Sequence, residues 1–265
     1  MTLLHNLNPQ QKKAVTASEG PVLVLSGPGS GKTRVLTRRV AWLVQRENVA
    51  PWRIMAVTFT NKAAREMRER LEGLLGPQQA HRLTLGTFHA TCARILRQEG
   101  EAIGIPRDYV IFDADDQRTL VRRILKELNL DDERFTPAAI HSVISRAKND
   151  LIPPDAYHPG TYVGEIARRV YGPYQEWLRA NGGLDFDDLL METARLFREV
   201  PQVTDRYQER YRHILVDEFQ DTNLSQYVLL RQLSARHRNL FAVADEDQSI
   251  YRWRGADYRN ISRLE

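Results

Sequence analysis

The 265-residue sequence predicts an α/β fold in which a parallel sheet carries helices on both faces. Three observations lead to this prediction. Short apolar runs alternate with helical patterns in the first half, amphipathic helical patterns fill the middle, and apolar runs return near the end. Alternation of strands and helices indicates a parallel sheet. The helical middle is interpreted as an insertion into the sheet domain.

The first half supplies three strand–helix pairs. Each strand is a short apolar run, and each following helix has apolar residues three and four positions apart. The predicted strands occupy residues 21–26, 53–58 and 83–86, and the predicted helices occupy residues 32–45, 62–74 and 89–99.

The middle of the chain has a helical pattern, and sheet-like runs follow it. Residues 120–128, 137–147 and 162–180 show helical spacing, with breaks at Pro153-Pro154 and Gly182-Gly183. Strands are predicted again at residues 213–217 and 239–244. We therefore expect a discontinuous core domain at residues 1–99 and 184–265, with an all-helical inserted domain at residues 100–183.

Composition excludes several classes of protein. Hydrophobic residues make up 42% and charged residues 27%, which is typical of a globular chain. No apolar run is long enough for a membrane helix, and the first twenty residues lack the apolar core of a signal peptide. The single cysteine, Cys92, excludes a disulfide framework. We expect a cytoplasmic protein without membrane partners, whose net charge of +4 permits nucleic-acid binding but does not establish it.

A glycine-rich segment between the first predicted strand and helix is typical of a phosphate-binding loop. It reads Ser26-Gly-Pro-Gly-Ser-Gly-Lys-Thr33, and its glycines allow backbone N–H groups to surround phosphate oxygens. Lys32 is expected to reach the β- and γ-phosphates, and the Thr33 hydroxyl to bind Mg²⁺. The alternative is a glycine-rich turn without a ligand. The candidate nucleotide-binding residues here are Ser26, Gly27, Gly29, Ser30, Gly31, Lys32 and Thr33.

An acidic pair follows the predicted strand at residues 213–217. Ligands of open α/β sheets bind at the carboxyl ends of the strands, where Asp217 is expected to lie. Asp217 is a candidate Mg²⁺ ligand, and Glu218 a candidate general base for the attacking water. The alternative is a solvated acidic loop. Combined with the glycine-rich loop, the pair predicts a hydrolase of magnesium-bound nucleoside triphosphates.

Further motifs identify a family. Leu7-Asn-Pro-Gln-Gln11, Asp217-Glu-Phe-Gln-Asp-Thr-Asn223 and the segment at residues 245–255 resemble motifs of the UvrD/Rep/PcrA group of superfamily 1 DNA helicases. The resemblance implies a RecA-like core that binds ATP and Mg²⁺. It also implies that Gln11 and Arg34 lie near the adenine and that Gln248 contacts the γ-phosphate. Ser26 and Ala244 depart from the family pattern, which has Ala and often Gly there.

The resemblance also implies a set of DNA-contacting residues. Aromatic side chains stack on bases, while cations and polar groups hold the phosphates. Without the resemblance, Phe59 and Phe186 are equally well interpreted as core residues, and His89 as a polar residue at a helix start. The candidate nucleic-acid residues are Phe59, Asn61, His89, Phe186, Tyr251, Trp253 and Arg254.

The function that the resemblance implies is ATP-driven movement, 3′ to 5′, along single-stranded DNA and at duplex junctions. We expect that the chain lacks the family's second RecA-like half, that it hydrolyses ATP poorly without that half, and that it is monomeric. Two alternatives stay open: a nucleotide-sensing lobe that binds single strands without turnover, and the helicase part of a RecB-like nuclease–helicase. The pathway stays open between repair, replication restart and plasmid replication.

Overall fold

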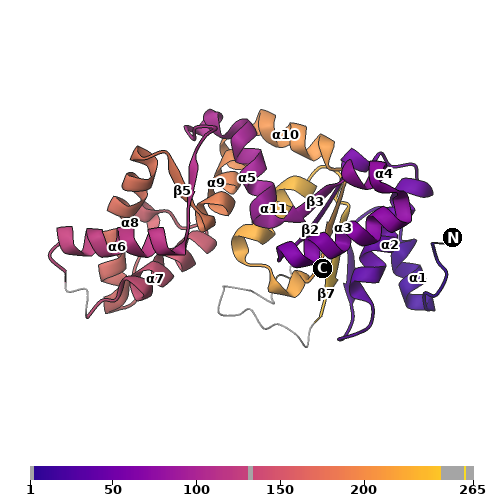
Figure 1. Cartoon of the computed structure of the whole chain (residues 1–265), viewed down its shortest axis with the longest axis horizontal. Helices are drawn as coiled ribbons and strands as arrows, with labels where there is room; N and C mark the ends of the chain where they lie inside the picture. Colours follow the sequence, from indigo (N-terminus) through magenta and orange to yellow (C-terminus); the bar gives the residue numbers. More distant parts are fainter. Residues whose placement is uncertain (1–2, 131–133, 246–259, 261–265) are drawn as a thin grey trace. The chain divides into compact units, whose positions relative to one another are not determined.

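The computed structural model describes residues 3–130, 134–245 and 260 (Figure 1). Internal contacts divide the chain into two compact units. Unit 1 comprises Met1–Thr91, Pro201–Thr222 and Gln226–Glu265, and unit 2 comprises Cys92–Val200 and Asn223–Ser225. The core and inserted domains proposed above, with their bounds at residues 100 and 184, stay a prediction.

Unit 1 contains a five-stranded sheet in which all neighbouring strands are parallel (Figure 1). The prediction of an α/β fold with a parallel sheet is therefore confirmed, and each strand begins and ends within one residue of its predicted bounds. The order across the sheet is β1 (Val22–Leu25), β7 (Leu240–Ala244), β6 (His213–Val216), β2 (Ile54–Thr58) and β3 (Thr84–Thr87).

Helices precede and connect the strands of unit 1. They are α1 (Pro9–Val15), α2 (Lys32–Gln45), α3 (Asn61–Leu75), α4 (Pro77–His81) and α10 (Pro201–Arg210). The helix α5 (Phe88–Glu99) begins in unit 1, and α11 (Leu224–Ser234) ends in it. Two 3₁₀ turns, η1 (Pro51–Arg53) and η4 (Phe219–Asp221), lie before β2 and after β6.

The central strands β2, β6 and β7 are buried on both faces. All five residues of β2 are buried, and alternate residues point to opposite faces. Ile54 and Ala56 join a cluster with α1, α2 and α3, whereas Met55 and Val57 are buried on the other face. This is why the strands read as continuous apolar runs in the sequence.

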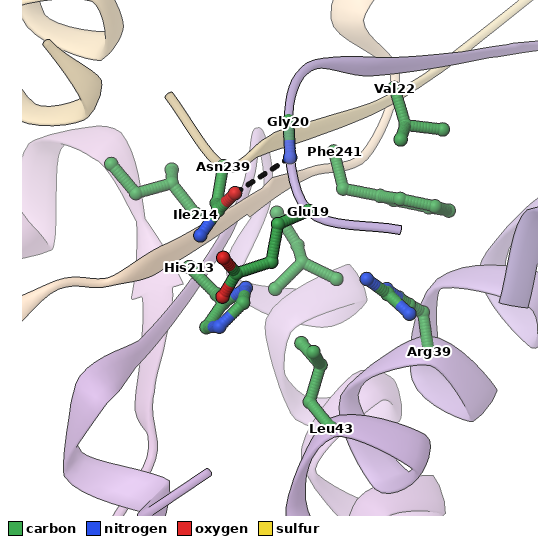
Figure 2. Close-up of a pocket in the computed structure, with 10 residues that line it drawn as sticks. Glu19, Gly20, Val22, Arg39, Leu43, His213, Ile214, Asn239 and Phe241 are labelled. Carbon is green, nitrogen blue, oxygen red and sulfur yellow. Dashed lines mark hydrogen bonds between the residues drawn. The ribbon is translucent and has the colours of Figure 1, made fainter. Parts of the chain in front are cut away.

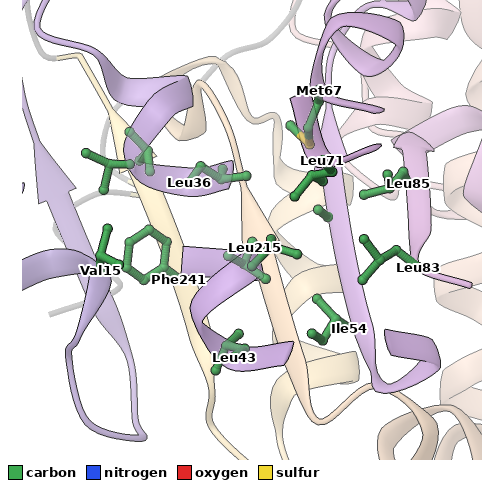
Figure 3. Packing of buried hydrophobic residues seen from close by; sticks show 14 of the residues in the cluster. Val15, Leu36, Leu43, Ile54, Met67, Leu71, Leu83, Leu85, Leu215 and Phe241 are labelled. Carbon is green, nitrogen blue, oxygen red and sulfur yellow. The ribbon is translucent and has the colours of Figure 1, made fainter. Parts of the chain in front are cut away.

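The cluster on one face attaches α2 to the sheet (Figure 3). Leu36 and Leu43 of α2 pack with Leu215 of β6 and Phe241 of β7. Leu36 and Leu43 are at most 1% exposed, and burying a leucine side chain contributes about 1.5–3 kcal/mol. The start of α2, where the glycine-rich loop ends, is therefore held in place by the packing of Leu36 and Leu43, one and three turns further along the helix.

Unit 2 is mostly helical. Its helices are α6 (Ala114–Glu127), α7 (Pro137–Asn149), α8 (Tyr162–Ala180) and α9 (Phe186–Glu199), with 3₁₀ turns η2 (Gly100–Ile103) and η3 (Pro154–Ala156). The structure adds a short parallel pair, β4 (Val110–Phe112) with β5 (Gly183–Asp185), that was not predicted. Three residues are too few to produce a strand pattern.

No helix in the described part of the chain is both long enough and apolar enough to span a bilayer.

A buried ionic cluster joins three helices of unit 2. Lys148 of α7 has no exposed side-chain surface, and its Nζ lies 2.6 Å from Asp185 Oδ2 and 2.8 Å from Asp188 Oδ1. Tyr174 of α8 donates a hydrogen bond to Asp185 Oδ2 at 2.8 Å. Asp185 also caps α9, accepting from the Asp188 backbone N–H at 2.8 Å. An unpaired buried charge would cost several kcal/mol, so these bonds are needed for unit 2 to keep the lysine inside.

The cluster contains more acidic than basic groups. Asp187 accepts a hydrogen bond from Asn149 Nδ2 at 2.9 Å, so three carboxylates lie close to the one ammonium group. Burial, together with the Asp185 charge, raises the pKa of Asp187 to about 6 and that of Asp188 to about 7. Between the ordinary and the raised pKa of Asp187 and Asp188, the folded unit therefore keeps protons on these carboxyl groups that the unfolded chain has released.

We predict that Asp187→Asn stabilises the chain above pH 7 and not at pH 4. The raised pKa means that the folded state binds more protons than the unfolded state between about pH 4 and pH 6, so stability falls as the pH rises through that window. The amide keeps a partner for Asn149 without the charge. Urea unfolding should show a gain on the order of 1–2 kcal/mol at pH 8, with the exposed Asp155→Asn as control. An equal gain at both pH values would contradict this assignment.

Candidate nucleotide site and DNA-contacting residues

The glycine-rich loop lies between β1 and α2, as predicted. Gly29 has φ 70° and Gly31 has φ 87°, a left-handed conformation that favours glycine. Gly31 is the N-cap of α2 and its carbonyl accepts from Val35 N at 3.0 Å, so α2 begins with N–H groups directed toward the loop. A helix start of this kind attracts anions.

Lys32 is held by oxygen atoms on three sides. Its Nζ lies 2.7 Å from Asp245 Oδ2, 3.2 Å from Gly27 O and 3.4 Å from Ser26 O. Asp245 follows β7 directly and is fully buried, and the Lys32 side chain is only 9% exposed. The ammonium group thus lies against the backbone of the glycine-rich loop. A phosphate that binds there would have to compete with Asp245 for the ammonium group.

Thr33 and Asp217 meet at the same edge of the sheet. Thr33 Oγ1 donates to Asp217 Oδ2 at 3.4 Å, and the Asp217 backbone N–H extends the sheet by bonding to Val57 O at 3.1 Å. Burial, and then the neighbouring Glu218 charge, raises the pKa of Asp217 to about 6. Among the described residues there is no group of three or more acidic, His or Cys side chains that could hold a metal. One hydroxyl and one carboxylate fit Mg²⁺, which commonly takes its remaining ligands from phosphates and water.

Glu218 has an unusual backbone. It has φ 52° and ψ 45°, a left-handed conformation that costs a non-glycine residue about 1 kcal/mol or more. Its carboxylate Oε2 accepts a hydrogen bond from Gln220 Nε2 at 2.8 Å. The turn η4 follows at once, and Glu218 is its N-cap residue.

The residues expected near the adenine lie beside the loop. Gln11 forms a capping box with Asn8 at the start of α1, and its Nε2 donates to Ser30 O at 2.8 Å. Arg34 is exposed, and its Nη1 donates to Asn6 O at 3.4 Å. Both side chains connect the N-terminal segment to the loop and its helix.

The structure adds two polar residues that the sequence analysis did not nominate. Asp245 directly follows an apolar run, which is the same signal that identified Asp217, so the sequence could have revealed it. Gln220 is 1% exposed and lies in η4. It stands inside the Asp217–Asn223 motif quoted above, which is the sequence signal that could have nominated it.

The candidate DNA residues have different environments. Phe59 is half-buried against Phe88, with ring centroids 5.6 Å apart. Asn61 is exposed at the start of α3, and His89 is half-buried near the start of α5. Phe186 belongs to unit 2 and is 48% exposed, which is unusual for a large aromatic side chain. The other three DNA candidates, Tyr251, Trp253 and Arg254, lie outside the described residues, as does Gln248, the candidate for the γ-phosphate contact.

A hollow at the opposite edge of the sheet contains none of the nominated residues (Figure 2). Asn239 Oδ1 accepts from Gly20 N at 2.7 Å there, and Glu19 lies beside His213, the first residue of β6. Burial, followed by the Arg39 charge, lowers the pKa of His213 to about 4. His213 is therefore neutral near pH 7. The pocket lies at the amino ends of β1, β6 and β7.

We predict that Gly31→Ala destabilises the chain by more than about 1 kcal/mol. Gly31 has a positive φ, and an added Cβ would lie 3.3 Å from Gln11 Nε2. The matched control is Gly27→Ala in the same loop, where φ is not positive and no atom lies within 4 Å of the added Cβ. Urea unfolding of the two variants measures the difference, and equal losses would show that the backbone at Gly31 is not constrained.

Known proteins resemble this chain over nearly its full length. The ATP-dependent DNA helicase PcrA of Bacillus subtilis (strain 168) is 51% identical over 265 residues, which cover 99% of this chain and 36% of that protein. The helicase of the same name from Leuconostoc citreum is 48% identical, covering 100% and 36%. That of Staphylococcus aureus is 47% identical, covering 99% and 36%. The chain thus spans about a third of the length of these relatives.

A family model described as the UvrD/REP helicase N-terminal domain matches residues 7–265. This match includes the glycine-rich loop, the acidic pair after β6 and the segment that follows β7. The resemblance seen in the sequence motifs is therefore confirmed, and the chain belongs to the UvrD/REP helicase N-terminal domain family.

Proposed function

We propose that this chain is the ATP-binding region of an ATP-dependent DNA helicase that moves 3′ to 5′ along single-stranded DNA. Family membership supports the proposal, as do relatives named ATP-dependent DNA helicases at about half identity. The observation that carries it is the meeting of Thr33 with Asp217 at the sheet edge where α2 begins, because a magnesium-bound nucleotide needs both groups.

Each side chain has a role in this proposal. The loop N–H groups and Lys32 bind the phosphates, while Thr33 and Asp217 hold Mg²⁺. Bound Mg²⁺ neutralises charge on the phosphate oxygens. Glu218 accepts the proton of the attacking water, and Gln11 and Arg34 orient the adenine. Gln248 is proposed to contact the γ-phosphate.

The proposed partners are single-stranded DNA, duplex junctions and a second RecA-like half that completes the nucleotide cleft. In the family that half supplies an adenine-stacking tyrosine and arginines that stabilise the transition state. Arginines of this kind raise rates by about 10³–10⁵. We propose that the protein is cytoplasmic and acts as a monomer.

We predict that Glu218→Gln abolishes ATP turnover and leaves Mg·ATP affinity unchanged. Loss of a general base lowers turnover by about 10²–10⁴-fold. ATP hydrolysis should be measured with and without single-stranded DNA in two proteins. The first is the 265-residue chain, in which slow turnover is expected, and the second is a hybrid that joins it to the remaining sequence of the Bacillus subtilis relative. The control is Glu69→Gln, which changes an exposed glutamate on α3.

Two results would contradict the assignment. Equal turnover by the wild type and Glu218→Gln would remove Glu218 from the reaction. Binding of ATP and oligonucleotide without turnover in either protein would favour a nucleotide-sensing lobe that binds single strands.

We predict that Phe186→Ala weakens binding of a labelled oligothymidylate by about 5- to 150-fold, corresponding to the loss of about 1–3 kcal/mol of base stacking. The matched control is Tyr162→Ala, because Tyr162 is also an exposed aromatic residue of unit 2, at 61%. Fluorescence anisotropy measures both affinities. If both variants lose affinity equally, or neither does, Phe186 is not a specific stacking residue.

A further inference from the structure

The side chain of Gln220 connects two parts of the candidate nucleotide site. Its Nε2 donates to Glu218 Oε2 at 2.8 Å, and its Oε1 accepts from the Asp245 backbone N–H at 2.9 Å. Gln220 is 1% exposed, so water does not compete for these bonds. All three residues belong to unit 1.

The chemistry of the partners fixes the orientation of this amide. The backbone N–H of Asp245 can only donate, so the atom facing it must be the amide oxygen. The NH₂ group then faces the Glu218 carboxylate oxygen, which accepts its hydrogen bond. The opposite orientation would place NH₂ against N–H and oxygen against carboxylate, which leaves both partners unsatisfied. One orientation alone satisfies the site.

Glu218 needs such support because its backbone is strained. Its left-handed conformation persists only where the surroundings determine it. Two hydrogen bonds act on the backbone: Glu218 N donates to Asp217 Oδ1 at 3.2 Å, and Glu218 O accepts from Asp221 N at 2.9 Å. The bond from Gln220 acts on the carboxylate itself, at the atom next to the proposed chemistry.

The other end of Gln220 leads to Lys32. Gln220 accepts a hydrogen bond from the Asp245 backbone N–H. The Asp245 carboxylate in turn lies 2.7 Å from Lys32 Nζ. A continuous chain of contacts therefore runs from the candidate general base, through Gln220 and Asp245, to the candidate phosphate-binding lysine.

We propose that Gln220 is a positioning residue for ATP hydrolysis. It fixes the Glu218 carboxylate by occupying Oε2, so that Oε1 accepts the proton of the attacking water, and it sets the distance of this carboxylate from Lys32. The inference rests on the proposed function of the site as an ATP hydrolase. Gln220 does not touch the nucleotide, and its loss should lower kcat without changing KM.

Two variants distinguish the hydrogen bond that Gln220 donates to Glu218 from the one that it accepts from Asp245. Gln220→Met has a similar shape and loses both bonds, whereas Gln220→Glu keeps an acceptor for Asp245 N–H and loses the donor to Glu218. The matched control is Gln208→Met, because Gln208 is part-buried on α10 and donates to Gln232 O at 2.7 Å away from the site. ATP turnover and Mg·ATP affinity are measured for each variant in the chain and in the hybrid described above, alongside a thermal unfolding curve.

Both Gln220 variants should lower kcat on the order of 10-fold, less than removal of the base itself, with KM and Mg·ATP affinity unchanged. The control should keep its kcat. Unchanged kcat in both Gln220 variants would overturn the proposal, and so would a loss confined to Gln220→Met, which would assign the effect to Asp245. If Gln220→Met fails to fold, Gln220→Glu decides alone. Failure of the proposed function is distinguishable, because the wild type and Glu218→Gln would then show the same turnover.

Discussion

All five strands of unit 1 run in the same direction, and the candidate site depends on this one constraint. Parallel strands bring their carboxyl ends to a single edge, so residues far apart in the sequence follow one another across the sheet. Ser26, Asp217 and Asp245 each come directly after a strand. The sheet hydrogen bonds continue into two of them, from Ser26 N to Ala244 O and from Asp217 N to Val57 O. A shift of one residue in any strand would turn the functional side chain to the opposite face.

The charges gathered at this edge are unbalanced. Asp217, Glu218 and Asp245 bring three carboxylates, and Lys32 is the ammonium group placed among them. Burial is the main cause of the raised pKa of Asp217, and the neighbouring Glu218 charge raises it further. A polyphosphate alone would add more negative charge. A divalent cation relieves the repulsion, which is a physical reason for such a site to accept the magnesium complex and not the free nucleotide.

Local features that need no knowledge of the fold were the predictable ones. The glycine-rich loop was recognisable because its backbone requires glycine and its lysine has a fixed spacing, and the strands because burial on both faces makes them uniformly apolar. Pairings across long sequence distances were not predictable. Lys32 and Asp245 are 213 positions apart. In the sequence, Lys148 cannot be told from a surface lysine of a helix, and only the fold shows that it pairs with Asp185 and Asp188. Phe59 shows the intermediate case, since its partner Phe88 comes from the next strand–helix unit.

The enclosed ammonium group of Lys148 also has a consequence for the chemistry of the folded chain in solution. Acylating reagents attack an amine only in its neutral form and only where they can reach it. Lys148 has no exposed side-chain surface, and its two carboxylate partners keep it charged by raising its pKa. It should therefore react only when unit 2 opens far enough to release Asp185 and Asp188. The labelling rate of this one lysine, measured by mass spectrometry, then reports the rate of local unfolding of unit 2.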